Sequence, residues 1–485
     1  MTGSESAADS VRTALSRWYS AVAAAPSAVR MKFGDPSWLR RPMVVYLSTL
    51  LYVLFLHLTY EFRISPLFAY LGYRYRSPEV WAYGVAIVLV LGLARVLPAR
   101  LSRASDFVLW ILFVTTSAPS ILVPQYADVL SPGSSTVLGL AVAGSFGLIV
   151  LALRLGPGPR QLRWRPRSEV VWAALIVFTV AFYAYMMVTV GLSIHVMSLT
   201  GVRPTRLAYR EVIANHGPAL AYLIGIQGYV LNPLFMIRGI RTRRWSVALL
   251  AALGQMLIFS ATGYKTIILS IPAVFAIALA FRNGRRPAGR LLLDGTVLVG
   301  AVALVVDAVV GAAEFTTVFV GRLILMPGAL TAAHVQFFAG QPKAEWGYSF
   351  LSHFVDYPYS KSPAMLVGAA FSGDPQISAN ASLFGDGYAN LGYLGMFVEA
   401  VVVVIILWAV NYATGRLPMA ASVAVITLPS LALANTSAFT SVLTGGFAAA
   451  VVVALVIPRS GWDAPAESWP ETRALRRVWR TLART

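Results

Sequence analysis

Long apolar runs, separated by short polar or basic segments, form the pattern of hydrophobic and polar positions along this chain. Most runs have the roughly 20 residues that an α-helix needs to cross the hydrocarbon core of a membrane. We place spans at 42–60, 80–97, 107–124, 135–153, 170–192, 218–237, 245–262, 265–281, 291–311, 386–410, 418–435 and 439–457. The pattern therefore predicts an all-α polytopic membrane protein with about 12 transmembrane helices.

Composition supports a chain whose main solvent is lipid. Of its 485 residues, 58% are hydrophobic and 12% are charged, whereas soluble domains carry about 25% charged residues. We expect one membrane domain at 42–457, an N-terminal tail at 1–41 and a C-terminal tail at 458–485. No cleavable signal peptide is visible near the N-terminus, so we expect the first helix to act as an uncleaved signal anchor.

The positions of the basic residues predict the orientation of the helices. About three quarters of the lysines and arginines fall in the two tails and in alternate connections, which the positive-inside rule assigns to the cytoplasm. Both termini are therefore predicted to be cytoplasmic, in a multi-pass protein of the inner or plasma membrane of the cell. This placement accounts for the net charge of +19 without a nucleic acid as partner.

Two predicted outer segments, at about 193–217 and 312–385, are longer than simple connections. The second is a long outer loop between helices 9 and 10, and short helices such as 318–338 are expected within it. Loops of this length in a compact domain are usually functional. The chain has no cysteine, and its five histidines lack metal-binding spacings, so we expect neither a metal site nor another cofactor.

Several basic residues on the predicted outer face run against the positive-inside rule. They are Arg203, Arg206, Arg210, Lys265, Arg322, Lys343 and Lys361. Arginine binds phosphate oxygens through two parallel hydrogen bonds and lysine acts as a point charge, so a lipid-linked phosphate or diphosphate would account for the set. The alternative is that each side chain reaches the lipid headgroups or pairs with a glutamate. Lys265, in a hairpin with almost no loop, is either such a ligand or an anchor at the membrane interface.

A glycine-rich segment, SLFGDGYANLGYLG at 382–395, opens the tenth predicted helix. Its glycines allow a close approach of the backbone or a broken start of the helix. Asp386 lies near the helix N-terminus, where the helix dipole favours a carboxylate. Asp386 is therefore either a helix cap or a general base, and Asp356 is the second candidate for the base.

Candidate sugar contacts lie in the same region of the chain. The aromatic run 346–359 suits sugar rings, whose C–H faces stack on aromatic surfaces. We predict that Trp346, Tyr388, Asn390 and His334 orient sugars. The alternative for the aromatic residues is the belt of Trp and Tyr at a membrane interface, and for His334 it is a structural role.

The order of these features resembles the Wzy-type O-antigen polymerases, also called oligosaccharide repeat unit polymerases. The likeness rests on the pair Tyr209-Arg210, the hairpin Thr262–Thr266, the segment that begins at Arg322 and the motif at 385–395, and it covers roughly residues 42–457. It implies a class C-like membrane glycosyltransferase that joins repeat units carried on polyprenyl diphosphate at the outer face. It implies as partners the polyprenyl-diphosphate-linked oligosaccharide, membrane lipid and a chain-length regulator or flippase.

The resemblance also implies catalytic roles. Arg210 and Arg322, with Lys265 and Arg206, would bind the donor diphosphate and stabilise it as it leaves, while Asp386 or Asp356 receives the proton of the acceptor hydroxyl. Arg322 departs from a family pattern in which a glycine follows eleven residues after the arginine, because position 333 is alanine. Two other functions stay open: a flippase or transporter of lipid-linked oligosaccharides, and an O-antigen-ligase-like glycan transferase.

Overall fold

The computed structural model describes residues 42–156, 167–191, 201–217, 219–349, 351–380 and 382–462. Within these ranges the chain is helical and has no β-strand, only two isolated β-bridges. Residues 46–485 form one unit, separate from residues 1–45. The predicted tail at 1–41 and most of the tail at 458–485 lie outside the described residues.

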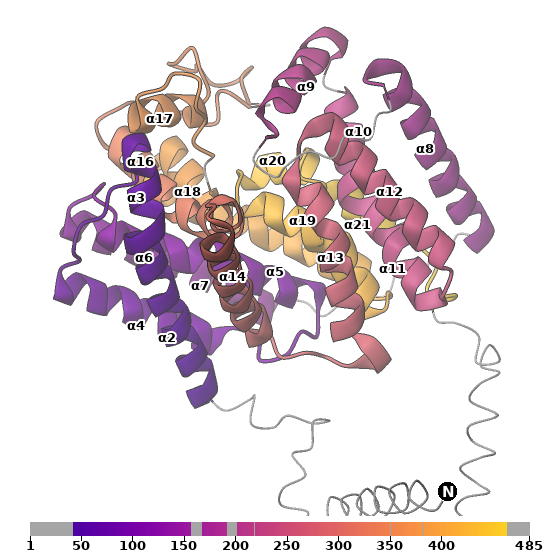
Figure 1. The fold of residues 1–485 in the computed structure, drawn as a ribbon, viewed down its shortest axis with the longest axis horizontal. Helices are drawn as coiled ribbons and strands as arrows, with labels where there is room; N and C mark the ends of the chain where they lie inside the picture. Colours follow the sequence, from indigo (N-terminus) through magenta and orange to yellow (C-terminus); the bar gives the residue numbers. More distant parts are fainter. Residues whose placement is uncertain are drawn as a thin grey trace, which may run out of the picture. The chain divides into compact units, whose positions relative to one another are not determined.

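Ten helices in the described ranges are long and apolar enough to cross a membrane, so this is a multi-pass membrane protein (Figure 1). They are Pro42–Leu71 (beginning with α2), Ala104–Tyr126 (α5 and α6), Pro132–Leu155 (α7), Ser168–Thr189 (α8), Ala219–Thr242 (α10 and α11), Trp245–Thr262 (α12), Arg290–Val310 (α14), Glu314–Ala339 (α15 and α16), Leu383–Thr414 (α18) and Ala438–Val456 (α20 and α21). Shorter apolar helices are α4 (Val80–Val96), α13 (Lys265–Ala280), α17 (Pro363–Ser372) and α19 (Met419–Leu433).

The predicted all-helical, multi-pass class is confirmed, and the spans differ in detail. The predicted spans 80–97, 265–281 and 418–435 are the shorter helices α4, α13 and α19. The other predicted spans each coincide with one of the ten long helices. The remaining long helix, Glu314–Ala339, lies inside the segment 312–385 that we predicted as an outer loop with short helices. The total of twelve crossings and the orientation stay predictions.

The predicted hairpin between α12 and α13 is confirmed. The first helix ends at Thr262 and the second begins at Lys265. Gly263 between them has φ +66° and its N–H donates to the Phe259 carbonyl at 2.8 Å. Glycine adopts this left-handed conformation without the steric cost of a side chain, so the chain reverses within two residues.

Helix α18 breaks near its start, which is one of the two outcomes that the glycine-rich segment allows. Leu391 (φ −140°) and Gly392 (φ +62°, ψ −147°) are not helical. A β-carbon on Gly395 would overlap the Gly387 carbonyl, so the two halves touch through backbone. The Ser382 side chain accepts a hydrogen bond from the Gly385 N–H and caps the helix, which leaves the Asp386 carboxyl to other partners.

Four long helices contain a π-helical segment, a feature that often marks functional sites. The segments are η2 (Tyr60–Ile64), η4 (Phe113–Ser117), η5 (Gln227–Leu231) and η7 (Thr317–Leu325). Both η2 and η4 pack against η7. Arg322 lies within η7. An irregular, packed stretch of helix therefore carries one of the residues that we predict to bind phosphate.

Candidate functional site

Four of the residues that we predict to bind phosphate come close together from three distant segments of the chain. Arg206 and Arg210 lie on the amphipathic helix α9 (Arg203–His216), Lys265 begins α13 and Arg322 lies in η7. Arg322 and Arg206 both act electrostatically on Lys265, and Arg322 and Arg210 both act on Arg206. Such effects arise between charges that are near neighbours. We call these four side chains the cation cluster.

The cation cluster consists of four basic side chains that act electrostatically on one another. Within the described ranges, none of its members forms an ion pair, although Glu314 acts weakly on Lys265. Burial, followed by the positive charges of Arg322 and Arg210, lowers the pKa of Arg206. Uncompensated like charges repel one another, so the arrangement favours binding of an anion.

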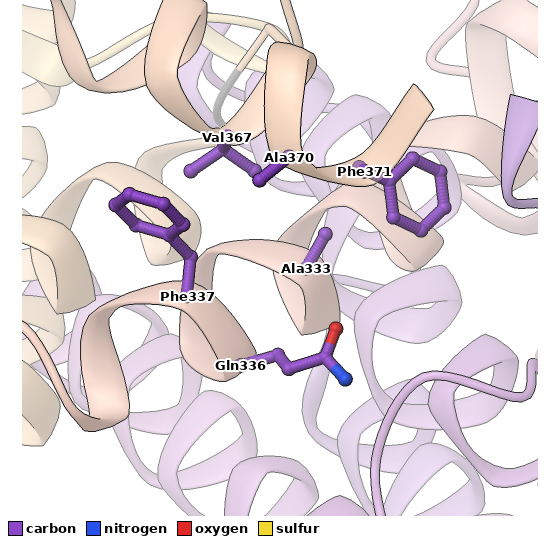
Figure 2. Close-up of a pocket in the computed structure, with 6 residues that line it drawn as sticks. All are labelled: Ala333, Gln336, Phe337, Val367, Ala370 and Phe371. Carbon is purple, nitrogen blue, oxygen red and sulfur yellow. The ribbon is translucent and has the colours of Figure 1, made fainter. Parts of the chain in front are cut away.

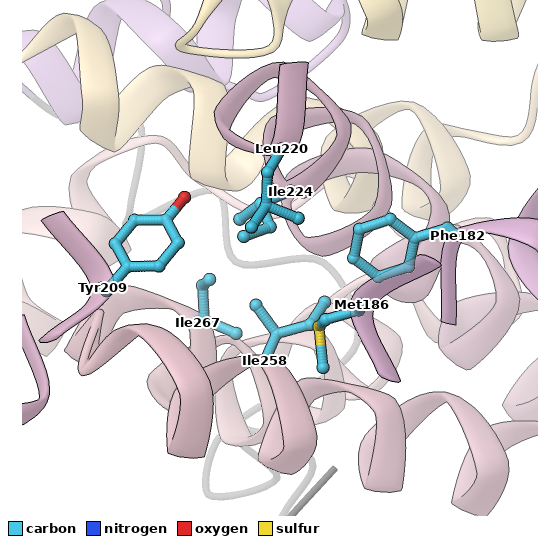
Figure 3. Close-up of a cluster of buried hydrophobic side chains, with 7 residues drawn as sticks. All are labelled: Phe182, Met186, Tyr209, Leu220, Ile224, Ile258 and Ile267. Carbon is cyan, nitrogen blue, oxygen red and sulfur yellow. The ribbon is translucent and has the colours of Figure 1, made fainter. Parts of the chain in front are cut away.

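Contacts of α9 hold two of these cations over the α12–α13 hairpin. The Arg206 Nε–H donates to the Gly263 carbonyl at 3.1 Å. A buried apolar cluster joins α9 to the helices below it (Figure 3). Its members are Phe182, Met186, Tyr209, Leu220, Ile224, Ile258 and Ile267. Tyr209 is 3% exposed and anchors α9 in this cluster. Arg206 and Arg210 lie on the same helix, so the anchored helix positions both arginines.

Tyrosines that the sequence analysis did not assign surround the cation cluster. The Tyr264 ring meets the Tyr209 ring edge to face, with centroids 5.6 Å apart. Arg206 and Arg210 act electrostatically on Tyr264, and Arg322 acts on Tyr73. Burial raises the pKa of Tyr264, and the two arginines oppose that effect. Phenol groups at the edge of a cationic site add hydrogen-bond donors for an oxyanion.

A second polar site forms around Asp386, which is 5% exposed. The Tyr348 hydroxyl donates to Asp386 Oδ1 at 2.6 Å. The Trp346 indole N–H lies 3.3 Å from Asp386 Oδ2 and 3.3 Å from Glu399 Oε1. Glu399 is fully buried. We call Asp386 and Glu399 the acid pair.

Glu399 is a site residue that the sequence analysis missed. Its Oε2 accepts a hydrogen bond from the Ala438 N–H at 2.8 Å, and its Oε1 lies 3.4 Å from the Ser437 hydroxyl. It is the one charged residue in the apolar stretch 391–410. An ionisable residue inside a membrane span is a functional candidate by default. The lone glutamate in this apolar stretch is therefore the sequence signal that identifies Glu399 as a site residue.

Two of the predicted sugar contacts support the acid pair through internal hydrogen bonds. The Asn390 amide N–H donates to Asp386 Oδ2 at 3.0 Å, and the Asn390 side-chain oxygen accepts from the backbone N–H of Trp346 at 2.6 Å. The Trp346 ring is 7% exposed and packs against Phe439, with centroids 5.6 Å apart. Both side chains therefore fix the carboxyl groups, and their contact with sugars stays a prediction.

The other predicted residues lie around this second site or apart from it. Lys343 Nζ lies 4.4 Å from the centroid of the Tyr388 ring. His334 is buried behind Gly385, with Nδ1 2.7 Å from the Leu330 carbonyl oxygen and no partner for Nε2 among the described residues. Asp356 is exposed and has no hydrogen bond or ion pair within the described ranges. The Arg203 side chain lies outside them.

The short segment Ala438–Gly446, which contains α20 (Ala438–Leu443), connects the surroundings of the two sites. At its start it donates to Glu399. At its end Gly446 packs against Tyr229, which interacts electrostatically with Tyr264 and Arg206. One short segment therefore contacts the acid pair at its start and the tyrosines beside the cation cluster at its end.

A cavity of about 210 Å³ lies between α16 (Met326–Ala339) and α17 (Figure 2). Its lining is apolar except for Gln336, and includes Phe337 and Phe371. It contains no member of the cation cluster or the acid pair. Among the described residues, no group of three or more histidines and carboxylates is placed to hold a metal ion.

The chain matches no protein-family model, no curated protein and no solved structure. The features of this chain that bear on its function are therefore the two polar sites and the sequence motifs.

Proposed function

We propose that this protein is a membrane glycosyltransferase that polymerises polyprenyl-diphosphate-linked repeat units into a polysaccharide at the outer face of the cell membrane. One observation carries the proposal: four cations from α9, the α12–α13 hairpin and η7 act electrostatically on one another, and within the described ranges none of them forms an ion pair. A diphosphate supplies the negative charge that this cluster lacks.

In the proposed reaction, the cation cluster binds the donor diphosphate. Arg210 and Arg322 are exposed and Lys265 is half-buried, so a ligand can reach all three. Charge develops on the diphosphate as the glycan leaves it, and positioned cations lower the energy of that transition state. Asp386, the first-choice base, receives the proton of the acceptor hydroxyl.

The test is complementation of a gene deletion with Arg210→Ala and Arg322→Ala. Each change is expected to reduce polymer formation about 100-fold or more, the usual effect of removing one group that stabilises developing charge. Arg95→Ala, an exposed arginine at the end of α4, is the matched control and should leave polymer length and yield unchanged. Undiminished polymer in either cluster variant would remove that arginine from the diphosphate site.

The intermediates that accumulate in the deletion strain separate the alternatives. If the deleted protein is a polymerase, single lipid-linked repeat units accumulate on the outer face. If it is a ligase, long chains accumulate on the lipid carrier. If it is a flippase, single units accumulate on the inner face. Extraction of the lipid-linked oligosaccharides from right-side-out vesicles, with and without external glycosidase, distinguishes the three results.

A further inference from the structure

The break in α18 brings together two carboxyl groups that a continuous helix would hold far apart. Asp386 precedes the break at Leu391–Gly392 and Glu399 follows it. Thirteen residues of unbroken α-helix would separate them by about 20 Å. Instead, the same Trp346 indole N–H lies 3.3 Å from an oxygen of each carboxyl group.

In the part of the chain that the structure describes, no cation forms an ion pair with either member of the acid pair. Its hydrogen-bond partners in the described residues are neutral: Tyr348, Trp346, Asn390 and the backbone and hydroxyl at the start of α20. Both carboxyl groups are buried, so ionisation of both would place two negative charges out of water with no ion-pair partner among the described residues. Like charges at this separation also disfavour double ionisation.

The other ionisable groups near the pair form no hydrogen bond with it among the described residues. Tyr357 is affected by the charge of Asp386 from the neighbouring loop. His334 of α16 lies behind Gly385 and already contacts Leu330. Lys343 donates to the Phe338 carbonyl, and Glu345 is exposed. The helices α20 and α21 contain no ionisable side chain.

We infer that Asp386 and Glu399 hold one proton between them and together accept the proton of the acceptor hydroxyl, which reaches them through Tyr348. This inference rests on the proposed transferase function and adds to it a second carboxyl group and a relay. Tyr348 is the partly exposed member of the site, whereas both carboxyl groups are buried.

The reaction balances as follows in atoms and charge. The acceptor oxygen forms a bond to the anomeric carbon of the donor, and the bond from that carbon to the diphosphate breaks with its electron pair on the diphosphate. The acceptor proton passes to the Tyr348 oxygen as Tyr348 gives its own proton to Asp386 Oδ1. The acid pair thus goes from one proton to two, and returns one to the outer water by the same route.

The properties of Tyr348 suit a relay rather than an independent base. Burial and the neighbouring Asp386 raise the pKa of Tyr348, so the phenol keeps its proton at neutral pH. Its hydrogen bond to Asp386 is 2.6 Å long, which is the short distance expected for a hydroxyl donating to a carboxylate.

The test uses the full chain reconstituted in lipid vesicles, with the lipid-linked oligosaccharide that accumulates in the deletion strain as substrate. Asp386→Asn and Tyr348→Phe are each expected to slow transfer about 100-fold or more, the range for loss of general-base catalysis. Glu345→Gln, an exposed glutamate beside Trp346, is the matched control and should keep the full rate. Wild-type rates in Asp386→Asn would overturn the inference.

Infrared spectroscopy provides a readout that a structural role would not alter. At neutral pH the wild type should show the C=O band of one buried protonated carboxyl group, and Asp386→Asn and Glu399→Gln should each lose it. A wild type without this band, or a band that persists in both variants, would contradict proton sharing. If the carboxamide variants do not fold, as judged by gel filtration, Tyr348→Phe still tests the relay by rate.

The two proposals fail in distinguishable ways. If Arg322→Ala abolishes transfer while Asp386→Asn and Tyr348→Phe keep it, the glycosyltransferase stands and the acid pair has no catalytic role. If the wild type forms no polymer from the accumulated substrate, the proposed function itself fails, and the proton relay fails with it.

Discussion

Arg206 illustrates how single residues of the cation cluster combine fixed geometry with uncompensated charge. Its Nε–H is held by the Gly263 carbonyl, so the side chain is oriented before any ligand arrives. Burial and nearby cations lower the pKa of Arg206, which means that its charged form is less stable here than in water. A bound anion would reverse that effect, so the surroundings of this one side chain favour an anion.

Tyr357 allows a residue-level test of the environment near the acid pair. Burial, then Tyr359 and the charge of Asp386, raise the pKa of Tyr357 to about 12. The protonated form is therefore favoured in the folded protein, and its contribution to stability is present below pH 10 and is lost as the pH rises towards 12. Ultraviolet difference titration of the wild type against Tyr357→Phe should place this phenolate near pH 12. A transition near pH 10 would show that Tyr357 is not in this environment.

At the scale of an element, the break in α18 determines what its carboxyl groups can do. The half before the break carries Asp386 and the half after it carries Glu399. The contact of Gly387 with Gly395 sets the distance between the halves. A side chain at this contact would push the halves apart, so glycine is required by close approach of backbone to backbone.

Gly395→Ala is expected to destabilise the protein by about 1–3 kcal/mol, the usual cost of overpacking, and to slow transfer by separating the acid pair. Gly147→Ala in α7 is the matched control, because a β-carbon there meets nothing within 4 Å. Thermal unfolding in detergent and the rate of transfer measure the two effects. Equal stability and rate in both variants would show that the contact is not needed.

At the scale of the whole molecule, the path of Glu314–Ala339 decides the topology. Just before this helix, the Ala312 carbonyl accepts a hydrogen bond from Arg63 at 3.3 Å. The C-terminal part of Glu314–Ala339 faces α17 across the cavity (Figure 2). Phe371 of α17 packs against Gly72. Arg63 and Gly72 lie at the same end of the first long helix, about 13 Å apart along it. A crossing needs about 30 Å, so we expect this helix to begin and end on one side.

Labelling of single cysteines tests this topology in a chain that has no cysteine. A membrane-impermeant maleimide added outside should label Ala312→Cys and Lys361→Cys, because both ends of Glu314–Ala339 are expected on the outer face. Arg285→Cys, in the basic connection before α14, should react only after permeabilisation. Labelling of Ala312→Cys and Lys361→Cys from opposite sides would mean that Glu314–Ala339 crosses the membrane.

The sequence alone predicted the features that depend on local chemistry. The membrane class follows from apolar runs of the length that a bilayer requires. The α12–α13 hairpin and the broken start of α18 follow from glycines at positions where the backbone needs them. Glu314–Ala339 was predicted as loop with short helices, because Arg322, His334 and Gln336 interrupt its apolar pattern.

Only the tertiary structure decided which polar side chains meet. Arg210, Lys265 and Arg322 are far apart in the chain, and they come together because α9 packs on the hairpin and Arg322 of η7 lies within electrostatic reach of Lys265 and Arg206. Glu399 reaches Asp386 because α18 breaks and folds its halves together. The order of residues determines what each helix can bury or expose, whereas the electrostatic energy of a charge depends on distances that helix packing alone establishes.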